Sequence, residues 1–128
     1  VEYEGRDRYY MVDIPTEACR DGHVLPVVFV VHGFTADPKK FMKLFTDAAH
    51  RYAMILVIPE GFARSWNGGA CCGKARELGL NSMGFLETVR RHLETLSIPL
   101  HPNALYALGK SNGGFLVTLD ARRRSGDV

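Results

Sequence analysis

The stretch that decides the fold reads Leu105-Tyr106-Ala107-Leu108-Gly109-Lys110-Ser111-Asn112-Gly113-Gly114. The apolar run Asn103 to Leu108 predicts a buried β-strand, and apolar residues from about Phe115 predict a short helix. Between the two lies the pattern G-x-S-x-G. In a strand-turn-helix context this pattern strains the backbone of the serine and lifts its hydroxyl out of the sheet. Ser111 is therefore the candidate nucleophile.

The neighbours of Ser111 suit the same interpretation. Gly109 and Gly113 have no Cβ, so the backbone can pass close to the adjacent strand and helix. The N-terminus of the following helix brings a positive dipole end and main-chain N–H groups near the serine oxygen. The amide of Asn112 is the natural first donor to an oxyanion formed when the serine attacks.

Two ligand-binding motifs share residues with this turn, and neither fits. A phosphate-binding P-loop ending in Gly109-Lys110-Ser111 requires glycine at position 104, where the chain has Ala104. A G-x-G-x-x-G dinucleotide fingerprint starting at Gly109 fails because its second glycine would be Ser111. A glycine-rich turn with an ordinary serine remains the alternative interpretation.

A second turn is predicted at the same edge of the sheet. His32-Gly33-Phe34-Thr35 follows the run Val27 to Val31, which is typical of a central parallel strand. The carboxyl ends of parallel strands open on one crevice, and Gly33 permits a bend that offers the Phe34 amide as a second oxyanion donor. We interpret His32 as support for this loop rather than as a general base, because the base of this motif follows the serine along the chain.

Two further strands are predicted outside these turns. Arg8 to Ile14 alternates polar and apolar residues, which is typical of a sheet edge, and Met54 to Ile58 is a second fully apolar run. A glycine-rich loop from Gly61 to about Gly79 follows that run and contains Trp66.

Two helices are predicted between the strands. The first is capped by Asp37, has Pro38 at its first position, and turns an apolar stripe toward the sheet: Phe41, Leu44, Phe45 and Ala48. The second opens at Asn81 or Ser82, stops before Pro99, and carries Phe85, Leu86, Val89, Leu93 and Leu96. Strands that alternate with helices in this way predict an α/β fold with a three-layer, mostly parallel sheet.

Composition limits the classes of partner. The 128 residues are 46% hydrophobic and 23% charged, as expected for one globular domain over residues 1–128 that requires no metal or cofactor to fold. A net charge of +2 makes nucleic acid a poor partner, and no apolar run is long enough to cross a membrane. Cys19, Cys71 and Cys72 do not form a C-x-x-C metal site, and their bonding state stays open.

Five motifs occur in order between about residues 25 and 118. They are His32-Gly33-Phe34-Thr35, Ile58-Pro59-Glu60-Gly61, Ser65-Trp66-Asn67-Gly68-Gly69 with Cys71-Cys72-Gly73, Met83-Gly84-Phe85-Leu86, and Gly109-Lys110-Ser111-Asn112-Gly113-Gly114. Together they resemble the secreted polyhydroxybutyrate depolymerase and feruloyl esterase family of α/β-hydrolases.

The resemblance implies an extracellular serine esterase with a Ser, Asp, His triad and no cofactor. Its substrates would be hydroxyalkanoate polyesters or hydroxycinnamate esters of plant cell-wall polysaccharides. Ser111 would be the nucleophile, and the amides of Phe34 and Asn112 would form the oxyanion hole. Trp66 is a candidate substrate contact, although packing within its loop is an equal alternative.

The sequence also departs from the family. Phe34 occupies a position where the family usually has a small residue, and the pattern ends near Leu119, before the strands that carry the catalytic Asp and His. We therefore expect the chain to represent the N-terminal half of an α/β-hydrolase, truncated after the helix that follows Ser111. His50, His92 and His101 are interpreted as surface or structural residues.

Two expectations follow from that truncation. The strand Asn103 to Leu108 has no segment to pair with its far side, so the open edge predicts self-association. A chain without the triad partners could also be a non-catalytic member of the same fold that binds esters, glycans or a protein.

Overall fold

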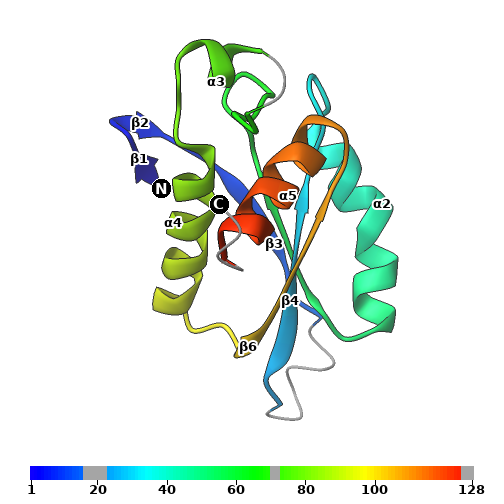
Figure 1. Cartoon of the computed structure of the whole chain (residues 1–128). Coiled ribbons are helices and arrows are strands. Elements are labelled where there is room, and N and C mark those ends of the chain that lie inside the picture. Colours follow the sequence, from blue (N-terminus) through cyan, green and yellow to red (C-terminus); the bar gives the residue numbers. More distant parts are fainter. Residues whose placement is uncertain (16–22, 70–72, 125–128) are drawn as a thin grey trace.

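A twisted four-stranded sheet organises the computed structural model, which describes residues 1–15, 23–69 and 73–124 (Figure 1). In spatial order the strands are β3 (Tyr10–Asp13), β5 (Ile55–Pro59), β4 (Leu25–Val31) and β6 (Leu100–Gly109). β4 runs parallel to both β5 and β6, whereas β3 pairs antiparallel with β5 at one edge. The predicted α/β class with a mostly parallel sheet is confirmed, and so is the edge position of the first long strand.

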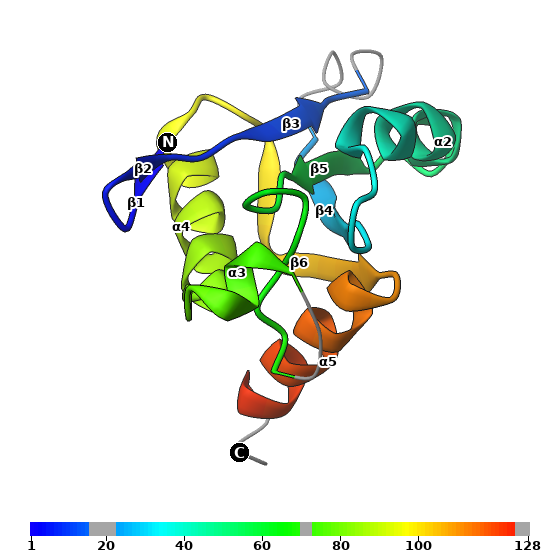
Figure 2. The ribbon, with the colours of Figure 1, turned by 90° about the horizontal axis from the view of Figure 1, so that it is seen from above.

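Helices cover both faces of this sheet (Figure 2). Helix α2 (Pro38–Arg51) lies on one face, and α4 (Ser82–Thr95) and α5 (Asn112–Arg124) lie on the other. Beyond the predicted elements the structure adds a small hairpin, β1 (Glu2–Tyr3) with β2 (Arg6–Asp7), and a single turn, α3 (Lys74–Glu77), within the predicted glycine-rich loop. The arrangement is the three-layer architecture that the sequence predicts.

Each face of the sheet has its own core. The larger core joins β4 and β5 to α4, α5 and Trp66, and the smaller one joins the opposite face of the same strands to α2. All five residues of β5 are buried. A strand covered on both faces has to be apolar throughout, which is why Ile55–Pro59 contains no polar side chain.

The predicted helix starts are confirmed by their caps. The Asp37 side chain accepts a hydrogen bond from the Lys39 amide at 3.0 Å, and Pro38 occupies the first turn of α2. The Asn81 side chain accepts from the Gly84 amide at 2.9 Å at the start of α4. Each cap satisfies a main-chain N–H that has no partner within its helix.

The predicted apolar stripe of α2 is wrong in part. Leu44 is 71% exposed and Ala48 is also exposed. The residues that contact the sheet are Phe41, Met42, Phe45 and Ala49. The helix is rotated so that Met42 and Ala49 replace the predicted pair, which leaves Leu44 beside the outer edge of the sheet.

The prediction that the strand before Gly109 is buried is also wrong. β6 lies at the edge of the sheet with β4 as its one neighbour, and Leu105, Tyr106 and Leu108 are 37%, 58% and 52% exposed. The strand is longer than predicted, beginning at Leu100, and α5 begins at Asn112 rather than near Phe115. The expected open edge is present.

The bonding state of the three cysteines is not addressed by the structure. Cys19, Cys71 and Cys72 lie outside the described residues. None of the helices in the described part of the chain is long and apolar enough to cross a membrane.

Candidate active site

The turn that carries Ser111 is a tight link between a strand and a helix. β6 ends at Gly109, α5 begins at Asn112, and Ser111 has φ 53°, in the left-handed region that side chains other than glycine rarely adopt. The strain expected of a G-x-S-x-G elbow is therefore present in the backbone. Ser111 is exposed to solvent.

Close backbone approach explains the glycines of the elbow. A Cβ on Gly113 would lie 2.2 Å from the carbonyl oxygen of Val31 and 2.3 Å from that of His32. A Cβ on Gly109 would lie 2.5 Å from the carbonyl oxygen of Gly113. The elbow can thus sit directly on the end of β4, where the Lys110 amide donates to the Val31 carbonyl at 3.1 Å.

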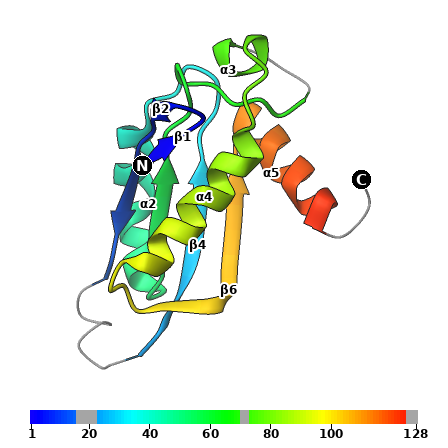
Figure 3. The ribbon, with the colours of Figure 1, turned by 90° about the vertical axis from the view of Figure 1, so that its left-hand side faces the viewer.

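The two turns identified from the sequence meet at this end of the sheet (Figure 3). β4 and β6 are paired up to Val31 and Gly109, so the turns that follow them leave the sheet side by side. A Cβ on Gly33 would lie 3.5 Å from the Cβ of Ser111. The two turns are therefore adjacent at the carboxyl ends of β4 and β6.

The main-chain amides proposed as oxyanion donors belong to these two turns. Asn112 is the first residue of α5, so its amide lies at the positive end of the helix dipole. The amide of Phe34 has no hydrogen-bond partner among the described residues. Next to it, the Thr35 amide donates to the Arg64 carbonyl at 2.9 Å, which ties the turn to the loop after β5.

Backbone strain is concentrated around these turns. Six described residues other than glycine have a left-handed φ, and four of them lie here: Thr35 (65°), Ala63 (48°), Arg64 (55°) and Ser111 (53°). Each such residue costs of the order of 1–3 kcal/mol and persists only where its surroundings hold it. The strain marks this end of the sheet as the part of the fold where geometry is kept at the expense of stability.

His32 supports the turn and is not placed to act as a base. It is fully buried, and its Nε2 accepts a hydrogen bond from the Gly61 amide at 2.9 Å. Its other nitrogen, Nδ1, therefore carries the proton and donates to the Gly33 carbonyl at 2.8 Å. Burial lowers the pKa of His32, which favours the neutral ring that this bonding pattern requires.

A buried clamp ties the loop after β5 to the start of α5. The Asn112 side chain accepts from the Trp66 amide at 2.7 Å and donates to the Trp66 carbonyl at 3.0 Å. The Trp66 indole N–H donates to the His32 carbonyl at 3.0 Å. The three fully buried residues His32, Trp66 and Asn112 thus join the ends of β4, the loop and α5 into one hydrogen-bonded unit.

This clamp shows the packed alternative for Trp66 and adds a role for the Asn112 side chain that was not predicted. Trp66 has no exposed surface, and its rings pack against His32 and Phe85 at centroid distances of 5.2 and 6.3 Å, so in this structure it does not offer a face to substrate. The side chain of Asn112 was not predicted to act, although an amide that can both donate and accept at an elbow is the signal that points to it.

Phe34 carries a large apolar ring in the turn that follows β4. Its side chain is 43% exposed and packs against Gly73, where a Cβ would lie 2.6 Å from Phe34 Cε2. Gly73 has φ 90°, so glycine is required there both by backbone conformation and by the ring.

The Ser111 hydroxyl makes no hydrogen bond with any residue that the structure describes. All five histidines lie in that part of the chain. His50 binds Asp13 at 2.5 Å, the Tyr10 hydroxyl contacts His92 Nδ1 at 2.5 Å, and His101 Nδ1 accepts from the Asn103 amide at 3.1 Å. The described residues likewise contain no group of three or more His, Cys, Asp or Glu that could hold a metal ion.

Comparison with known proteins identifies the fold. No model of a known protein family matches the sequence, and a search of curated proteins also finds no match. Among solved structures, the chain is similar to Est1E from Butyrivibrio proteoclasticus with ferulic acid bound, with a TM-score of 0.66 and 17% sequence identity. The match covers 96% of this chain and 46% of Est1E, so the chain spans about half the length of that protein. The chain therefore has a distant α/β-hydrolase-like fold.

Proposed function

We propose that this chain is the nucleophile-bearing part of a serine carboxylesterase, in which Ser111 attacks the ester carbonyl. The observation that carries the proposal is the left-handed φ of 53° at Ser111, between a strand and a helix and in contact with the turn of Gly33. A strained, exposed serine at the carboxyl edge of a parallel sheet is the geometry of a nucleophile elbow. The hydrolase-like fold supports the same assignment.

The proposed reaction follows acyl transfer in two steps. The Ser111 oxygen forms a bond to the carbonyl carbon as its proton passes to a base, and the carbonyl electron pair moves onto oxygen. The amides of Phe34 and Asn112 donate to that oxyanion, and each such donor typically contributes about 3 kcal/mol to lowering the barrier. The alcohol then leaves with the proton, and water releases the acid from Ser111 by the reverse sequence.

The reaction also requires a base, and none of the residues that the structure describes is hydrogen-bonded to the Ser111 hydroxyl. Both ring nitrogens of His32 are already engaged, by the Gly33 carbonyl and the Gly61 amide. Hydrolases that lack triad members keep a residual rate about 10³-fold above water from the oxyanion hole and binding, so the chain should show weak, detectable activity.

We further propose hydroxycinnamate esters as substrates, with hydroxyalkanoate polyesters as the other candidate class. The sequence motifs resemble the family that acts on both, and the structurally similar Est1E is described with ferulic acid bound. The exposed ring of Phe34 beside the proposed donor is suited to stack on a planar aromatic acyl group.

A fluorophosphonate probe tests the nucleophile. We expect intact-mass and peptide mapping to place the adduct on Ser111, and Ser111→Ala to abolish it. Ser97, an exposed serine remote from the elbow, is the matched control, and Ser97→Ala should label like the unchanged chain. Labelling of Ser111 no faster than of Ser97 would contradict the proposal. Turnover of p-nitrophenyl ferulate and p-nitrophenyl 3-hydroxybutyrate then separates the two substrate classes.

A non-catalytic binding role is the second candidate function. It is favoured by the absence of any base contact to Ser111 among the described residues. In that case methyl ferulate would bind without turnover, and calorimetry would give the same affinity for Ser111→Ala as for the unchanged chain. Any Ser111-dependent turnover rules this role out.

A further inference from the structure

A small pocket lies at the carboxyl edge of the sheet, on the side of β3. It has a volume of about 170 Å³ and is lined by residues 7–9, which lead into β3, and residues 60–63, which follow β5. β3 is antiparallel to β5, with Tyr10 opposite Pro59, so the beginning of β3 lies beside the carboxyl end of β5. The pocket therefore lies at the same edge of the sheet as the elbow of Ser111.

The pocket is lined by a buried guanidinium group that has unused hydrogen-bond donors. Arg8 is 4% exposed, and its guanidinium lies 3.9 Å from the centroid of the Phe85 ring. Its one hydrogen bond to a described residue is long, from Nη2 to the Glu60 carbonyl at 3.5 Å. The Nε and Nη1 groups thus have no partner there. Since no fully buried side-chain nitrogen in the described part of the chain lacks a partner, both groups keep access to open space.

This arrangement leaves the charge of Arg8 poorly compensated. Buried charges in proteins are normally paired with an opposite charge and hydrogen-bonded, but no carboxylate among the described residues forms an ion pair with Arg8. Burial lowers the pKa of Arg8, because the charged form loses solvation. Oxygen atoms of a ligand in the pocket would supply the missing acceptors.

The charges around the pocket limit the kind of ligand. Asp7 and Glu60 line the pocket with exposed carboxylates, against the single positive charge of Arg8. Arg6 and Glu4 lie close enough to Arg8 to affect its pKa, and they add one charge of each sign. The surroundings therefore have no excess of positive charge that would attract an anion. A suitable ligand is uncharged, donates hydrogen bonds to the carboxylates and accepts them from the guanidinium, as hydroxyl groups do.

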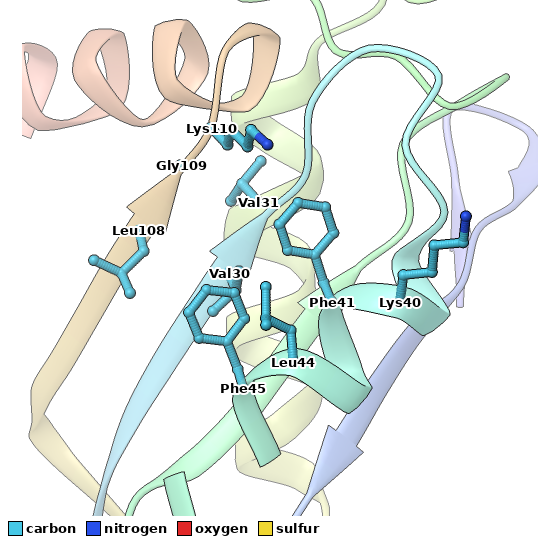
Figure 4. Close-up of a pocket in the computed structure, with 9 residues that line it drawn as sticks. All are labelled: Val30, Val31, Lys40, Phe41, Leu44, Phe45, Leu108, Gly109 and Lys110. Carbon is cyan, nitrogen blue, oxygen red and sulfur yellow. The ribbon is translucent and has the colours of Figure 1, made fainter. Parts of the chain in front are cut away.

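The groove between α2 and the end of β6 offers a contrast (Figure 4). It is larger, at about 290 Å³, but its side chains are apolar except for those of Lys40 and Lys110. None of these side chains can accept a hydrogen bond. Donors and acceptors are combined in the small pocket and not in this groove.

We propose that the small pocket binds one sugar ring. The sugar hydroxyls donate to the carboxylates of Asp7 and Glu60 and accept from Nε and Nη1 of Arg8. Tyr9 also lines the pocket and is 63% exposed, so its ring is available to the apolar C–H face of the sugar. The volume suits a single ring, because pockets for drug-sized ligands measure about 300–1,000 Å³.

The position of the pocket extends the proposed esterase function, and this step rests on that function. β4 separates β5 from β6, and neighbouring strands are about 4.8 Å apart, so the ends of β5 and β6 are roughly 10 Å apart. A ligand with a sugar ring at one end and an ester at the other can reach both the pocket and Ser111. The sugar would then be the alcohol part of the hydroxycinnamate ester.

Titration of the isotope-labelled 128-residue chain, followed by nuclear magnetic resonance, tests the pocket without any variant. The probes are the methyl glycosides of glucose, xylose and arabinose, and sodium acetate serves as the anion. We expect at least one glycoside to shift the Arg8 Nε–H resonance and the amide resonances of residues 60–63, with a dissociation constant in the millimolar range. Acetate should leave these resonances unchanged.

A matched pair of variants tests the acceptor. Glu60→Gln removes the negative charge at an exposed position, so the fold should persist, and the dissociation constant should rise about fivefold or more, because hydrogen bonds to charged groups are the stronger ones. Glu77→Gln is the control, an exposed carboxylate of α3 that does not line the pocket, and it should leave the constant unchanged.

Several results would overturn the sugar site. They are shifts with acetate alone, no shift with any glycoside, shifts that avoid Arg8 and residues 60–63, and equal weakening by Glu77→Gln. The result is independent of the nucleophile test with the fluorophosphonate probe. Glycoside binding to a chain whose Ser111 is unreactive would support the pocket and contradict the esterase, whereas a reactive Ser111 without glycoside binding would overturn the pocket alone.

Discussion

β5 and the second half of β6, Ala104 to Leu108, belong to the same mostly parallel sheet and are both apolar, yet one is buried and the other is exposed. Every residue of β5 is buried between two strands and two helical layers. In β6, which has one neighbour, Leu105, Tyr106 and Leu108 are 37–58% exposed. Apolar, β-branched or aromatic sequence is enough to specify a strand, whereas burial depends on which elements exist to pack on it.

The same contrast between a buried and an exposed position is found in the candidate active site, at the consecutive residues Ser111 and Asn112. Asn112 is fully buried and gives both ends of its side chain to Trp66. Ser111 is exposed and bonds to none of the described residues through its hydroxyl. We call the buried part of the elbow, with Asn112, Trp66 and His32, its inner side, and the exposed part around the Ser111 hydroxyl its outer side. The inner side is held by hydrogen bonds, whereas the outer side is accessible to a ligand, a base or a partner. Changes on the inner side should cost stability, and changes on the outer side should not.

The largest effect is expected at Gly113. In Gly113→Ala the new Cβ would meet two backbone carbonyl oxygens at 2.2 and 2.3 Å, and neither can move without displacing the end of β4. We expect the free energy of unfolding to fall by about 4 kcal/mol or more, measured by urea denaturation. Gly114→Ala is the control, since its Cβ would approach a neighbour no closer than 3.3 Å, and it should change stability by less than about 1 kcal/mol. Equal effects would show that the close approach is not what the glycine provides.

A smaller loss is expected at Asn112. In Asn112→Ala the buried amide and carbonyl of Trp66 both lose their partner, at about 1–3 kcal/mol each, so the free energy of unfolding should fall by about 3 kcal/mol. Trp66 is the one tryptophan of the chain, so its fluorescence follows the clamp directly. Thr118→Ala, on an exposed position of α5, should leave both stability and fluorescence almost unchanged. A loss below about 1 kcal/mol would mean that water replaces the amide.

A pH effect should follow from His32 on the same inner side. Burial lowers its pKa below the unfolded value of 6.5, so between the two pKa values the unfolded chain binds more protons. Stability is therefore complete above pH 6.5 and declines as the pH falls below it. His32→Gln should have a lower free energy of unfolding at neutral pH. Its free energy of unfolding should also change less with pH between pH 6.5 and 4.5 than that of the unchanged chain.

A second titrating group, Glu87, affects stability at a lower pH than His32 does. Hydrogen bonds from Arg90 lower the pKa of Glu87 to about 2, so its contribution is lost only as the pH falls from 4.5 through about 2. Glu87→Gln should change the pH dependence of the free energy of unfolding below pH 4.5 and leave it unchanged between pH 6.5 and 4.5. A chain whose urea midpoint is constant between pH 6.5 and 4.5 would contradict the role given to the His32 ring.

The sequence predicted the elements that follow from local rules. The caps at Asp37 and Asn81, the two buried strands β4 and β5 and the alternation of strands and helices all depend on residues close together in the chain. The elbow was also visible, because Gly109, Ser111 and Gly113 lie within five consecutive residues. The hydrolase-like fold follows from the same order of elements.

What the sequence did not predict depends on contacts between distant residues. The rotation of α2 that exposes Leu44 is decided by how the helix packs on Met54 and the strands, since an amphipathic stripe tolerates a shift of one position. The pairing of the Asn112 side chain with Trp66 joins residues 46 positions apart. Burial of β6 was predicted from its composition alone, although composition does not report the number of neighbouring strands.

The smallest effect, and the most direct test of the outer side, concerns the backbone of Ser111. Alanine and glycine both remove the hydroxyl, but at φ 53° alanine pays about 1–2 kcal/mol that glycine does not. Glycine loses about 0.5–1 kcal/mol more conformational entropy on folding. Ser111→Gly should therefore be more stable than Ser111→Ala by about 0.5–1 kcal/mol in urea denaturation.

The same pair of substitutions at Thr118, an exposed position within α5, should give the opposite order, because glycine in a helix is about 1 kcal/mol less stable than alanine. Opposite orders of stability at positions 111 and 118 would show that glycine is favoured at position 111 by its left-handed backbone and not by a general tolerance of glycine in this region. If Ser111→Gly proved less stable than Ser111→Ala, the serine would not be held in the left-handed conformation, and the elbow would lose the feature on which its proposed chemistry depends. A reversal as expected means that the fold holds Ser111 in the left-handed conformation at a cost in stability, which is the backbone geometry that the proposed nucleophile elbow needs.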